Sequence, residues 1–591
     1  MSAMSNSVKP IALENVLDPR LECMGYAQNQ LKFGVQKSAE YSNWIQQQCN
    51  SYSTSGLQWN FNVEETVILD RRVLAECQYK ITFTGTAPAG QPLLLGGRDA
   101  PRAYPLSTIT NSLKATLNGG STEVQLSDAI QALLHYNNEF ETTQYDLSMT
   151  PARLDNFQSY ADGANSNANP LADYQNSAYE LGRGAFQLDS IVNPVCVDGI
   201  TPVQAVVYFT VTEPLFVSPF LYSADQLDAG LIGVKNMAVS FSFNSGNLSR
   251  IWSHAGGAGV VFTQPPLVEI GPNATAPPKL HLNKLTPPLV DIGKVPKDII
   301  YEYNKTDVYV NDLNQSLASG ATATFVNNAI QLSTVPKCIY IYASLPPAYR
   351  DYTTTDTFFR VNNISLQYLN VSGQFSSMQE RDLYQLCLKN GLKMNWNEFH
   401  GMSQNLSTGG NVPLCGAVLK IDADDLAIPS NLASGVNVNS QLSYSISLTN
   451  VSAQAKNIQL TTVVIYDGLI TITEGQMITQ VGVVSQQDVL ETRMNGSWVA
   501  KKTWGSLVGG SFWDKIKSFG RSVISGVKQV LPVVAPAVKA LVPESRPVLT
   551  ALGMGYSEDM MGAGLMGGRK GKGLVGGRKM SRAEMARMLE N

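Results

Sequence analysis

The stretch CQYKITFT, residues 77–84, alternates apolar and polar side chains at every position. Alternation with a period of two is typical of a β-strand that buries one face and exposes the other. The same period recurs along most of the chain, in LQWNFNV (57–63), VYFTV (207–211), MAVSFSF (237–243), ISLQY (364–368) and LSYSISL (442–448), with a last clear strand around residues 469–472. The sequence therefore predicts an all-β protein with few, short helices.

Seven prolines separate these strands into two sets: Pro265, Pro266, Pro272, Pro277, Pro278, Pro287 and Pro288. Proline has no N–H to donate to a neighbouring strand, so this stretch favours two successive antiparallel β-sandwiches over a single large barrel. We predict an N-terminal arm at residues 1–50, a first sandwich at 51–280, a second sandwich at 281–500 and a tail at 501–591.

Two short helices are predicted between the strands. Residues 127–135 carry an apolar stripe at helical spacing. Residues 378–389 are preceded by Ser377, which with Glu380 forms a capping-box pattern, and are followed by Asn390-Gly391 as a stop signal.

The charge of the chain is low and unevenly distributed. Only 15% of the 591 residues are charged, compared with roughly 25% in an ordinary protein. Such a composition suits broad protein–protein contacts that do not desolvate charge. Residues 501–591 hold 15 Lys and Arg against 6 Asp and Glu, whereas the remaining residues hold 28 against 41. A basic tail on an acidic body indicates a separate, anionic partner for the tail.

Motifs for catalysis are missing from the sequence. The four histidines, at positions 135, 254, 281 and 400, are far apart, and no zinc-type spacing, phosphate-binding glycine loop or GxSxG motif occurs. We therefore expect no enzymatic activity and no cofactor, and we interpret His135 as a capping or packing residue. The seven scattered cysteines, with Cys77 and Cys338 in apolar strand patterns, predict a reduced protein. The N-terminus has no apolar core, so we expect no signal peptide and no secretion.

One acidic cluster is a candidate metal site. Asp422, Asp424 and Asp425 are close in sequence, and closely spaced carboxylates are the ligands that Ca²⁺ prefers. Acidic residues directly after a strand more often form a solvated loop. We favour the loop and predict no metal site, with calcium binding as the alternative.

The tail contains an amphipathic pattern and a basic, glycine-rich run. The predicted helix combines an aromatic and apolar face with intervening lysines and arginines, a pattern typical of membrane-interface helices. A helix that docks inside a larger assembly would show the same pattern. Residues 569–579 carry charges that could contact the phosphates of nucleic acid, or could simply be solvated. The candidate membrane-active residues are Phe512, Trp513, Ile516, Phe519, Val523 and Val527.

Several stretches resemble, in the same order, motifs of one viral protein family. They are PLSTITNSLKATLNGG (105–120), SDAIQALLHY (127–136), VPKCIYIYA (335–343), NISLQY (363–368), GQFSS (373–377), WNEFHG (396–401) and GAVLKID (416–422). They are similar to blocks in the major capsid proteins of polinton-like viruses, virophages and adintoviruses, and the resemblance covers roughly residues 50–490.

This resemblance implies a double jelly roll that assembles as a homotrimer. Three copies would make a pseudo-hexagonal capsomer in the icosahedral shell of a double-stranded DNA virus. The implied partners are neighbouring capsomers and a penton protein, and the implied location is the virion, assembled inside the host cell.

The tail resembles substrates of adenovirus-type maturation proteases. These proteases cut after patterns such as [MIL]-x-Gly-Gly, or after [MIL]-x-Gly-x where Gly follows. The segment that starts at residue 511 resembles the amphipathic start of the adenovirus internal membrane-lytic protein. The body has further copies at 94–97 and 117–120, which we expect folding to protect. The predicted cleavage positions in the tail lie between Gly510 and Ser511, Ala563 and Gly564, Gly568 and Arg569, and Gly577 and Arg578.

Two other functions fit parts of the sequence. A single-stranded RNA virus coat protein with a lytic tail would combine a single jelly roll with a protruding domain. A carbohydrate-binding β-sandwich protein would use polar, aromatic-tipped loops to bind sugars.

Overall fold

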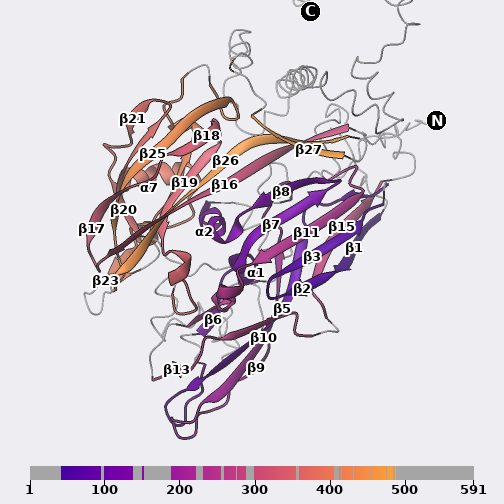
Figure 1. The fold of residues 1–591 in the computed structure, drawn as a ribbon, viewed down its shortest axis with the longest axis vertical. Helices are drawn as coiled ribbons and strands as arrows, with labels where there is room; N and C mark the ends of the chain where they lie inside the picture. The colour runs from indigo at the N-terminus through magenta and orange to yellow at the C-terminus, as the bar shows by residue number, and fades with distance from the viewer. Residues whose placement is uncertain are drawn as a thin grey trace, which may run out of the picture. The chain divides into compact units, whose positions relative to one another are not determined.

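The computed structural model describes residues 41–64, 66–94, 99–136, 150–151, 188–220, 230–254, 259–273, 276–287, 298–354, 359–404, 411–413, 416–429, 432–452, 454–473, 476–482 and 486. Within these residues, antiparallel strands form two sandwiches of two main sheets each (Figure 1). The first sandwich contains strands β1 to β15 and the second contains β16 to β27.

The first sandwich consists of sheets A and B. Sheet A has the order β1-β15-β5-β10-β9, with β4 beside β15 and with β13 and β14 beside β5, and sheet B has the order β2-β3-β11-β7-β8. The bounds in sheet A are β1 (Tyr41–Gln48), β4 (Ile68–Leu69), β5 (Leu74–Thr86), β9 (Leu188–Val192), β10 (Val203–Pro214), β13 (Val261–Phe262), β14 (Leu267–Ile270) and β15 (Lys279–Thr286). Those in sheet B are β2 (Ser51–Ser53), β3 (Gly56–Asn62), β7 (Thr110–Leu117), β8 (Gly120–Val124) and β11 (Asn236–Phe243).

The second sandwich consists of sheets C and D. Sheet C has the order β16-β26-β19-β24, with β27 beside β26, and sheet D has the order β17-β25-β20-β21, with β18 beside β25. The bounds in sheet C are β16 (Asp298–Leu317), β19 (Cys338–Ser344), β24 (Val418–Asp422), β26 (Lys456–Thr473) and β27 (Gln476–Val481). Those in sheet D are β17 (Thr322–Val326), β18 (Ile330–Thr334), β20 (Arg360–Tyr368), β21 (Val371–Gln374) and β25 (Asn437–Thr449).

Short elements complete the two sandwiches. Two small sheets pair β6 (Asp99–Pro101) with β12 (Trp252–His254) and β22 (Met402–Gln404) with β23 (Asn411–Pro413). The helices are α1 (Pro105–Ile109), α2 (Leu126–Tyr136), α7 (Glu380–Lys389) and α8 (Trp396–His400), with 3-10 turns η5 (Ser245–Ile251), η6 (Pro347–Tyr349) and η7 (Ala423–Asp425).

The alternation of residues 77–84 places one face of β5 in the core. Tyr79, Ile81 and Phe83 are fully buried, whereas the intervening Gln78 and Lys80 are only partly covered on the other face. The Phe83 ring packs 5.1 Å from the ring of Trp252. Burial of such large side chains stabilises the sandwich, because each removes a large apolar area from water.

Both sandwiches connect their strands in the same way. Eight principal strands, numbered in chain order, are β1, β3, β5, β7, β8, β10, β11 and β15 in the first sandwich and β16, β17, β19, β20, β21, β24, β25 and β26 in the second. In each sandwich, one sheet has the order 1-8-3-6 and the other has 2-7-4-5. This is the connection of an eight-stranded jelly roll, so the predicted double jelly roll is confirmed.

The limits of the first sandwich differ from the predicted ones at both ends. Its first strand, β1, starts within the predicted arm and pairs along its whole length with β15, which crosses the predicted limit at residue 280. The proline-rich stretch contains β14 and β15 because its prolines flank the strands: Pro265 and Pro266 precede β14, and Pro287 follows β15. Proline at a strand boundary removes no ladder hydrogen bond.

Both predicted helices are present. The predicted N-cap of α7 was wrong, and strand β27 was not predicted. Helix α2 extends one residue beyond the prediction at each end, and α7 begins at Glu380, with the capping box formed by Gln379 and Asp382. The predicted Ser377–Glu380 box was wrong. Residues 375–377 form a turn directly after β21, with Ser376 N donating to Gly373 O, and the Glu380 side chain pairs with Arg360 and His400. Helix α7 ends at Lys389, with Asn390 as its C-cap, as the predicted stop signal requires. Strand β27 lies beyond the last strand expected.

Candidate assembly surfaces

Helix α2 of the first sandwich packs against the outer face of sheet C (Figure 1). The Tyr136 ring lies 5.4 Å from the Tyr340 ring of β19 in an edge-to-face arrangement, and the Tyr136 hydroxyl donates to the carbonyl of Val418 in β24. The Lys420 ammonium lies 5.8 Å from the centre of the Tyr136 ring. Aromatic contacts of this kind add to area burial, so α2 fastens one sandwich to the other.

The first turn of α2 makes polar contacts with the second sandwich. The Tyr342 hydroxyl donates to the main-chain carbonyl of Asp128, and the Arg350 guanidinium lies 3.0 Å from the Asp128 carboxylate. Both side chains of this ion pair are largely shielded from water, at 15% and 16% exposed. A shielded pair with fixed geometry sets orientation as well as energy.

Two buried arginines of the first sandwich hold a loop of the second. Arg102 Nη2 donates to the carbonyl of Asp351 at 3.2 Å and to the carbonyl of Thr354. Arg250 Nη1 donates to the same two carbonyls, at 2.9 and 3.0 Å, and to the Thr354 hydroxyl. A buried guanidinium requires several acceptors to offset its lost hydration, and main-chain carbonyls supply them here.

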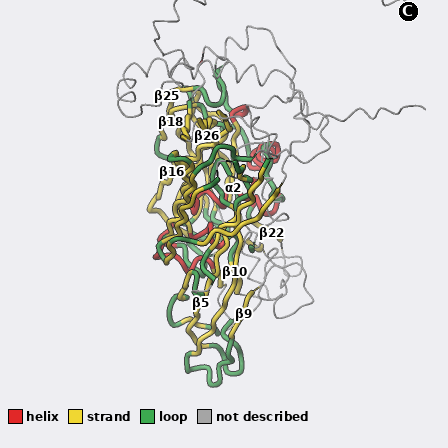
Figure 2. Tube along the Cα trace, turned by 90° about the vertical axis from the view of Figure 1, so that its right-hand side faces the viewer, coloured by secondary structure: helices red, strands yellow, loops and turns green. Residues whose placement is uncertain are grey.

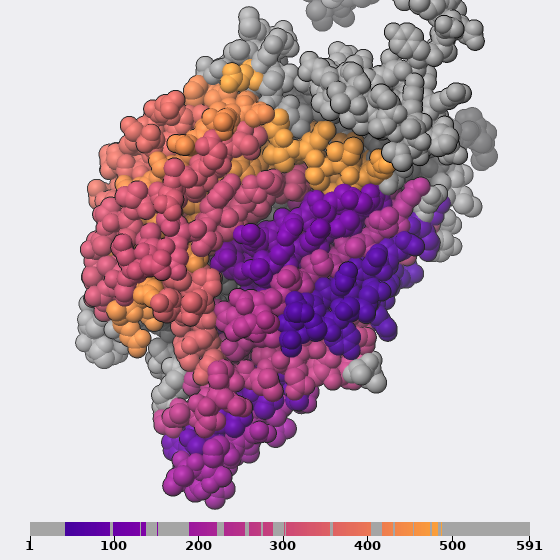
Figure 3. All heavy atoms as spheres, in the orientation of Figure 1, coloured from indigo at the N-terminus to yellow at the C-terminus, as the bar shows by residue number. Residues whose placement is uncertain are grey.

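Sheets of the two sandwiches also meet directly. Figure 3 shows the orange atoms of the β26–β27 region lying against the purple atoms of β8. The approach is close because Gly120 lacks a side chain: a Cβ there would lie 2.5 Å from the carbonyl oxygen of Met477. Any larger residue would force the two strands apart.

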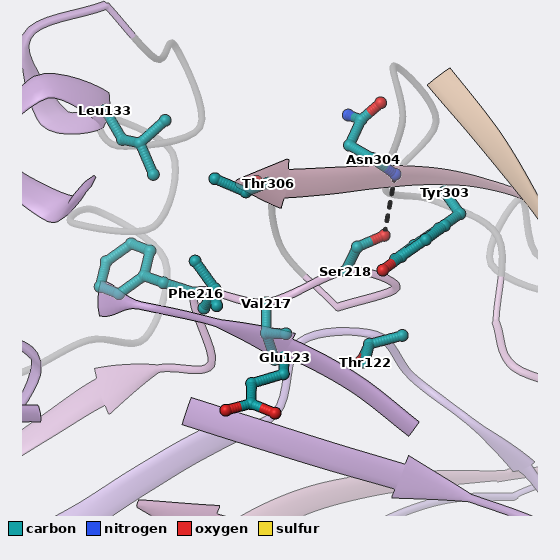
Figure 4. Close-up of a pocket in the computed structure, with 10 residues that line it drawn as sticks. Thr122, Glu123, Leu133, Phe216, Val217, Ser218, Tyr303, Asn304 and Thr306 are labelled. Atoms are coloured by element: carbon teal, nitrogen blue, oxygen red, sulfur yellow. Dashed lines mark hydrogen bonds between the residues drawn. The ribbon is translucent and has the colours of Figure 1, made fainter. Parts of the chain in front are cut away.

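The cavity between α2, β8 and β16 is too small for an organic ligand (Figure 4). The space open to the centre of a water molecule is about 10 Å³, which is room for about one water. Leu133 lines one side and Tyr303 the other, and Asn304 N donates to Ser218 Oγ at 3.3 Å. The cavity is therefore a packing defect between the sandwiches.

Two titratable side chains of the first sandwich, Glu213 and His135, are buried. Glu213 accepts hydrogen bonds from the backbone N–H groups of Leu106 and Ser107, at 2.8 and 2.9 Å, and from the Ser107 hydroxyl. Burial raises the pKa of Glu213 to about 7, and these donors counteract the rise. Burial lowers the pKa of His135 to about 4. Both side chains are buried, and His135 packs in the last turn of α2, as predicted.

The three aspartates of the candidate calcium site are used within the protein. Asp425 accepts hydrogen bonds from Lys389 and Asn390 and from the backbone N–H of Asp422, and Asp422 pairs with Lys420 at 3.3 Å. Asp424 lies in the same 3-10 turn, η7. In the part of the chain that the structure describes, no group of three or more His, Cys, Asp or Glu side chains is arranged to hold a metal ion.

The described cysteines are free thiols. Cys77 and Cys338 are buried in strands, as their apolar patterns predict, and burial raises the pKa of Cys338 to about 12. A thiol held protonated by burial is a poor nucleophile, so these cysteines act as small apolar residues.

An exposed apolar loop joins β9 to β10, at the end of the molecule that β5, β9 and β10 reach together (Figure 2). Val197 and Ile200 are 89% and 81% exposed. The Asp198 carboxylate accepts hydrogen bonds from the Thr201 hydroxyl at 2.6 Å and from the backbone N–H groups of Thr201 at 2.8 Å and Ile200 at 2.9 Å. These bonds fix the turn and lower the pKa of Asp198 to about 2. This loop was not predicted, although its signal is present in the sequence as Val195, Val197 and Ile200 around the Asp198-Gly199 turn.

The predicted tail sites lie outside the described residues. This applies to the cleavage positions at 510–511, 563–564, 568–569 and 577–578 and to the helix residues from Phe512 to Val527. The body copy of the cleavage motif at 117–120 forms the β7–β8 hairpin, where Leu117 is fully buried. Among the described residues, no helix combines the length and apolarity needed to span a membrane.

Comparison with known proteins identifies the family. The model for the first domain of the Sputnik virophage major capsid protein matches residues 15–280, and the model for the major capsid protein V20 C-terminal domain matches residues 307–468. The chain is also 30% identical, over 599 aligned residues, to the putative capsid protein V20 of Sputnik virophage, covering 96% of this chain and 98% of that protein. The chain belongs to the virophage major capsid protein family.

Solved structures of virophage capsid proteins have the same fold. The cryo-EM structure of the Sputnik virophage matches with a TM-score of 0.71 and 28% identity, over 85% of this chain and 99% of that one. The crystal structure of the mavirus major capsid protein matches with a TM-score of 0.62 and 14% identity, over 79% and 95%. The latter likeness concerns the fold alone.

Membership of the virophage major capsid protein family decides between the functions left open by the sequence. The chain is a structural component of the virion, and its relatives are capsid proteins rather than enzymes. Two jelly rolls contradict the single jelly roll with a protruding domain expected of the RNA virus alternative. The carbohydrate-binding alternative has no support among these relatives.

Proposed function

We propose that three copies of this virophage major capsid protein form a pseudo-hexagonal capsomer that tiles an icosahedral shell around double-stranded DNA. The observation that supports the proposal is the repeated strand order 1-8-3-6 and 2-7-4-5 in both sandwiches. Two similar units per chain give six similar units around a three-fold axis, and a six-sided block can pack against six neighbours.

The junction between the sandwiches suits this role. The buried contacts of Arg102, Arg250 and Tyr136 hold the two jelly rolls in one orientation. A shell built from many copies requires building blocks with a fixed shape. We propose neighbouring capsomers and a penton protein as the partners of this block, and the host cell as the place of assembly.

Light scattering on the purified full chain tests the trimer. The expected mass is about 192 kDa, three times the 64.1 kDa of one chain. A mass that stays at 64.1 kDa over all concentrations contradicts the proposal. Electron micrographs of the same sample should show six-sided particles with a three-fold axis.

We also propose that a viral maturation protease releases the tail after assembly. The support is sequence alone: four protease-type motifs cluster within residues 507–577. The basic run and amphipathic helix favour an anionic partner for the released segment, either viral DNA or a membrane. Flotation of the full chain with anionic vesicles, compared with retention on duplex DNA, separates these two partners.

A further inference from the structure

The outer face of sheet C is covered by the first sandwich of the same chain. Residues that pair directly across neighbouring strands project to the same face. One such row runs across β24, β19 and β26 through Val418, Tyr342 and Thr461, and each is at most 2% exposed. Tyr342 meets Asp128 of α2, so α2 and its surroundings form the cover.

Among the residues that the structure describes, no such cover lies over the equivalent face of the first sandwich, on sheet A. Strands β10 and β5 occupy the sixth and third positions that β24 and β19 occupy in the second sandwich. Their outer row runs through Val192, Val206, Thr82 and Leu267, on β9, β10, β5 and β14. Val192 and Leu267 are 59% and 58% exposed. The row crosses three strand spacings, which is about 14 Å.

Charges beside this row are already paired within sheet A. Lys80 forms an ion pair with Glu269 in the next row, and Asp189 accepts hydrogen bonds from Gln78 at 2.9 Å and Thr210 at 2.7 Å. A partner can therefore cover the apolar row without stranding an unpaired charge. Apolar surface with few free charges is typical of the core of a protein–protein interface.

Helix α7 is the counterpart of α2 in the second sandwich. Each helix follows the fifth strand of its sandwich, β8 or β21, and each packs on the fourth, β7 or β20. Arg381, Gln385 and Leu388 lie on the exposed side of α7, at positions i, i+4 and i+7. Leu388 is an apolar side chain that is 38% exposed on this side.

We propose that the Val192–Val206–Thr82–Leu267 row of one copy is covered by the α7 side of a second copy, as α2 covers sheet C within one chain. The contact is heterologous, because different patches of the two copies meet, and a heterologous contact generates rings. Around the three-fold axis of a trimer, three such contacts between copies would alternate with three contacts between the two sandwiches of one chain. The inference rests on the proposed trimer and names the surfaces that join it.

Matched charge substitutions on the full chain test these surfaces. Leu267→Asp, and separately Leu388→Asp, should lower the mass in light scattering from about 192 kDa to 64.1 kDa, because each places an unpaired carboxylate in all three contacts. Val326→Asp is the control: Val326 is 68% exposed on β17, outside both surfaces, and this variant should remain a trimer. All three positions are exposed, so thermal unfolding should be close to that of the original chain.

Mixing the two dissociated variants tests the pairing. The Leu267→Asp chain keeps its α7 side and the Leu388→Asp chain keeps its sheet A face, so the mixture can form one intact contact and no closed ring. The expected species is a one-to-one dimer of about 128 kDa, twice 64.1 kDa, which neither variant forms alone.

The outcomes separate this inference from the trimer proposal. An unsubstituted chain that is monomeric overturns both. An unsubstituted trimer with a trimeric Leu267→Asp variant overturns only the inference, as does dissociation by Val326→Asp or a mixture that stays at 64.1 kDa.

Discussion

Arg102 in the first jelly roll donates a hydrogen bond of 3.2 Å to the carbonyl of Asp351 in the second. The two residues are 249 positions apart in the sequence, and Arg102 is fully buried. Arg250 donates to the same carbonyl at 2.9 Å. One loop of the second jelly roll is therefore held by two guanidinium groups of the first.

Removing either arginine should destabilise the chain. Arg102→Met or Arg250→Met keeps much of the side-chain volume but leaves the carbonyls of Asp351 and Thr354 short of a donor, and we expect a loss of about 2 kcal/mol in the free energy of unfolding. Denaturant titration measures it. Lys114→Met, at an exposed position of β7, is the control and should change the value by less than about 0.5 kcal/mol. An equal change in the free energy of unfolding at all three positions would contradict the role of the two arginines in holding the loop.

Glu213 should make stability fall as the pH rises. Its folded-state pKa of about 7 lies above the ordinary value of 4.5, so the folded chain binds the proton more tightly between these pH values. Its contribution is full below pH 4.5 and decreases up to pH 7, by roughly 3 kcal/mol. The difference in unfolding free energy between the original chain and Glu213→Gln should show this slope. A difference that is constant with pH would contradict it.

The contribution of His135 to stability should increase as the pH rises, opposite to that of Glu213. Its folded-state pKa of about 4 lies below the ordinary value of 6.5, so its contribution is full above pH 6.5 and is lost as the pH falls towards 4, again by roughly 3 kcal/mol. Comparison with His135→Gln over this range measures it. The two slopes largely cancel in the unsubstituted chain, so each appears only in its own variant.

Gly120 should tolerate no side chain. Gly120→Ala places a Cβ 2.5 Å from the Met477 carbonyl oxygen, and we expect a loss of about 1–3 kcal/mol in thermal or denaturant unfolding. Gly246→Ala is a matched control, because its Cβ would lie 3.6 Å from the Asn244 side chain. A smaller effect at Gly120 than at Gly246 would show that β8 and β27 are not in close contact.

Mature particles should carry a shortened chain. Cleavage after Gly510 removes 81 residues, and intact-mass measurement of purified particles should show that loss. Gly510→Val should leave the chain whole at this position, because Ser511 follows the cut and only the [MIL]-x-Gly-Gly pattern, with Gly at 510, matches there. The copy at residues 117–120, which is paired in the β7–β8 hairpin, should remain uncut in both cases. Particles with only full-length chain would disprove the cleavage.

Sequence patterning predicts most of the strands, because residues such as Tyr79, Ile81 and Phe83 carry the period of two by themselves. Strand β1 was missed because YSNWIQQQ has no such period: it lies at the edge of sheet A, and four of its residues from Ser42 to Gln46 are exposed. Its place in the sheet depends on pairing with β15, more than 200 residues away. Local patterns cannot encode a partner at that distance.

Interaction surfaces are less predictable than strands for the same reason. Nothing local distinguishes Arg102 and Arg250 from solvated arginines, since their acceptors lie in another jelly roll. In the sequence, the residues of the outer row of sheet A follow the ordinary alternation of a strand. Val192 and Leu267 simply fall on its solvent-facing side. The equivalent face of sheet C is covered within the chain, whereas no part of the chain that the structure describes covers this row.

Because α2 is covered by the second jelly roll, its surroundings change during translation. The last strand of the first jelly roll ends at Thr286, whereas β24, which brings Val418 and Lys420 to Tyr136, ends at Asp422. A ribosome adding 5–20 residues per second makes that intervening segment in roughly 7–27 s. During this interval all strands of the first jelly roll have been synthesised, whereas the β24 residues that contact Tyr136 have not. The second half of each chain thus finds its docking surface already synthesised, tethered at high effective concentration, before another chain can compete for it.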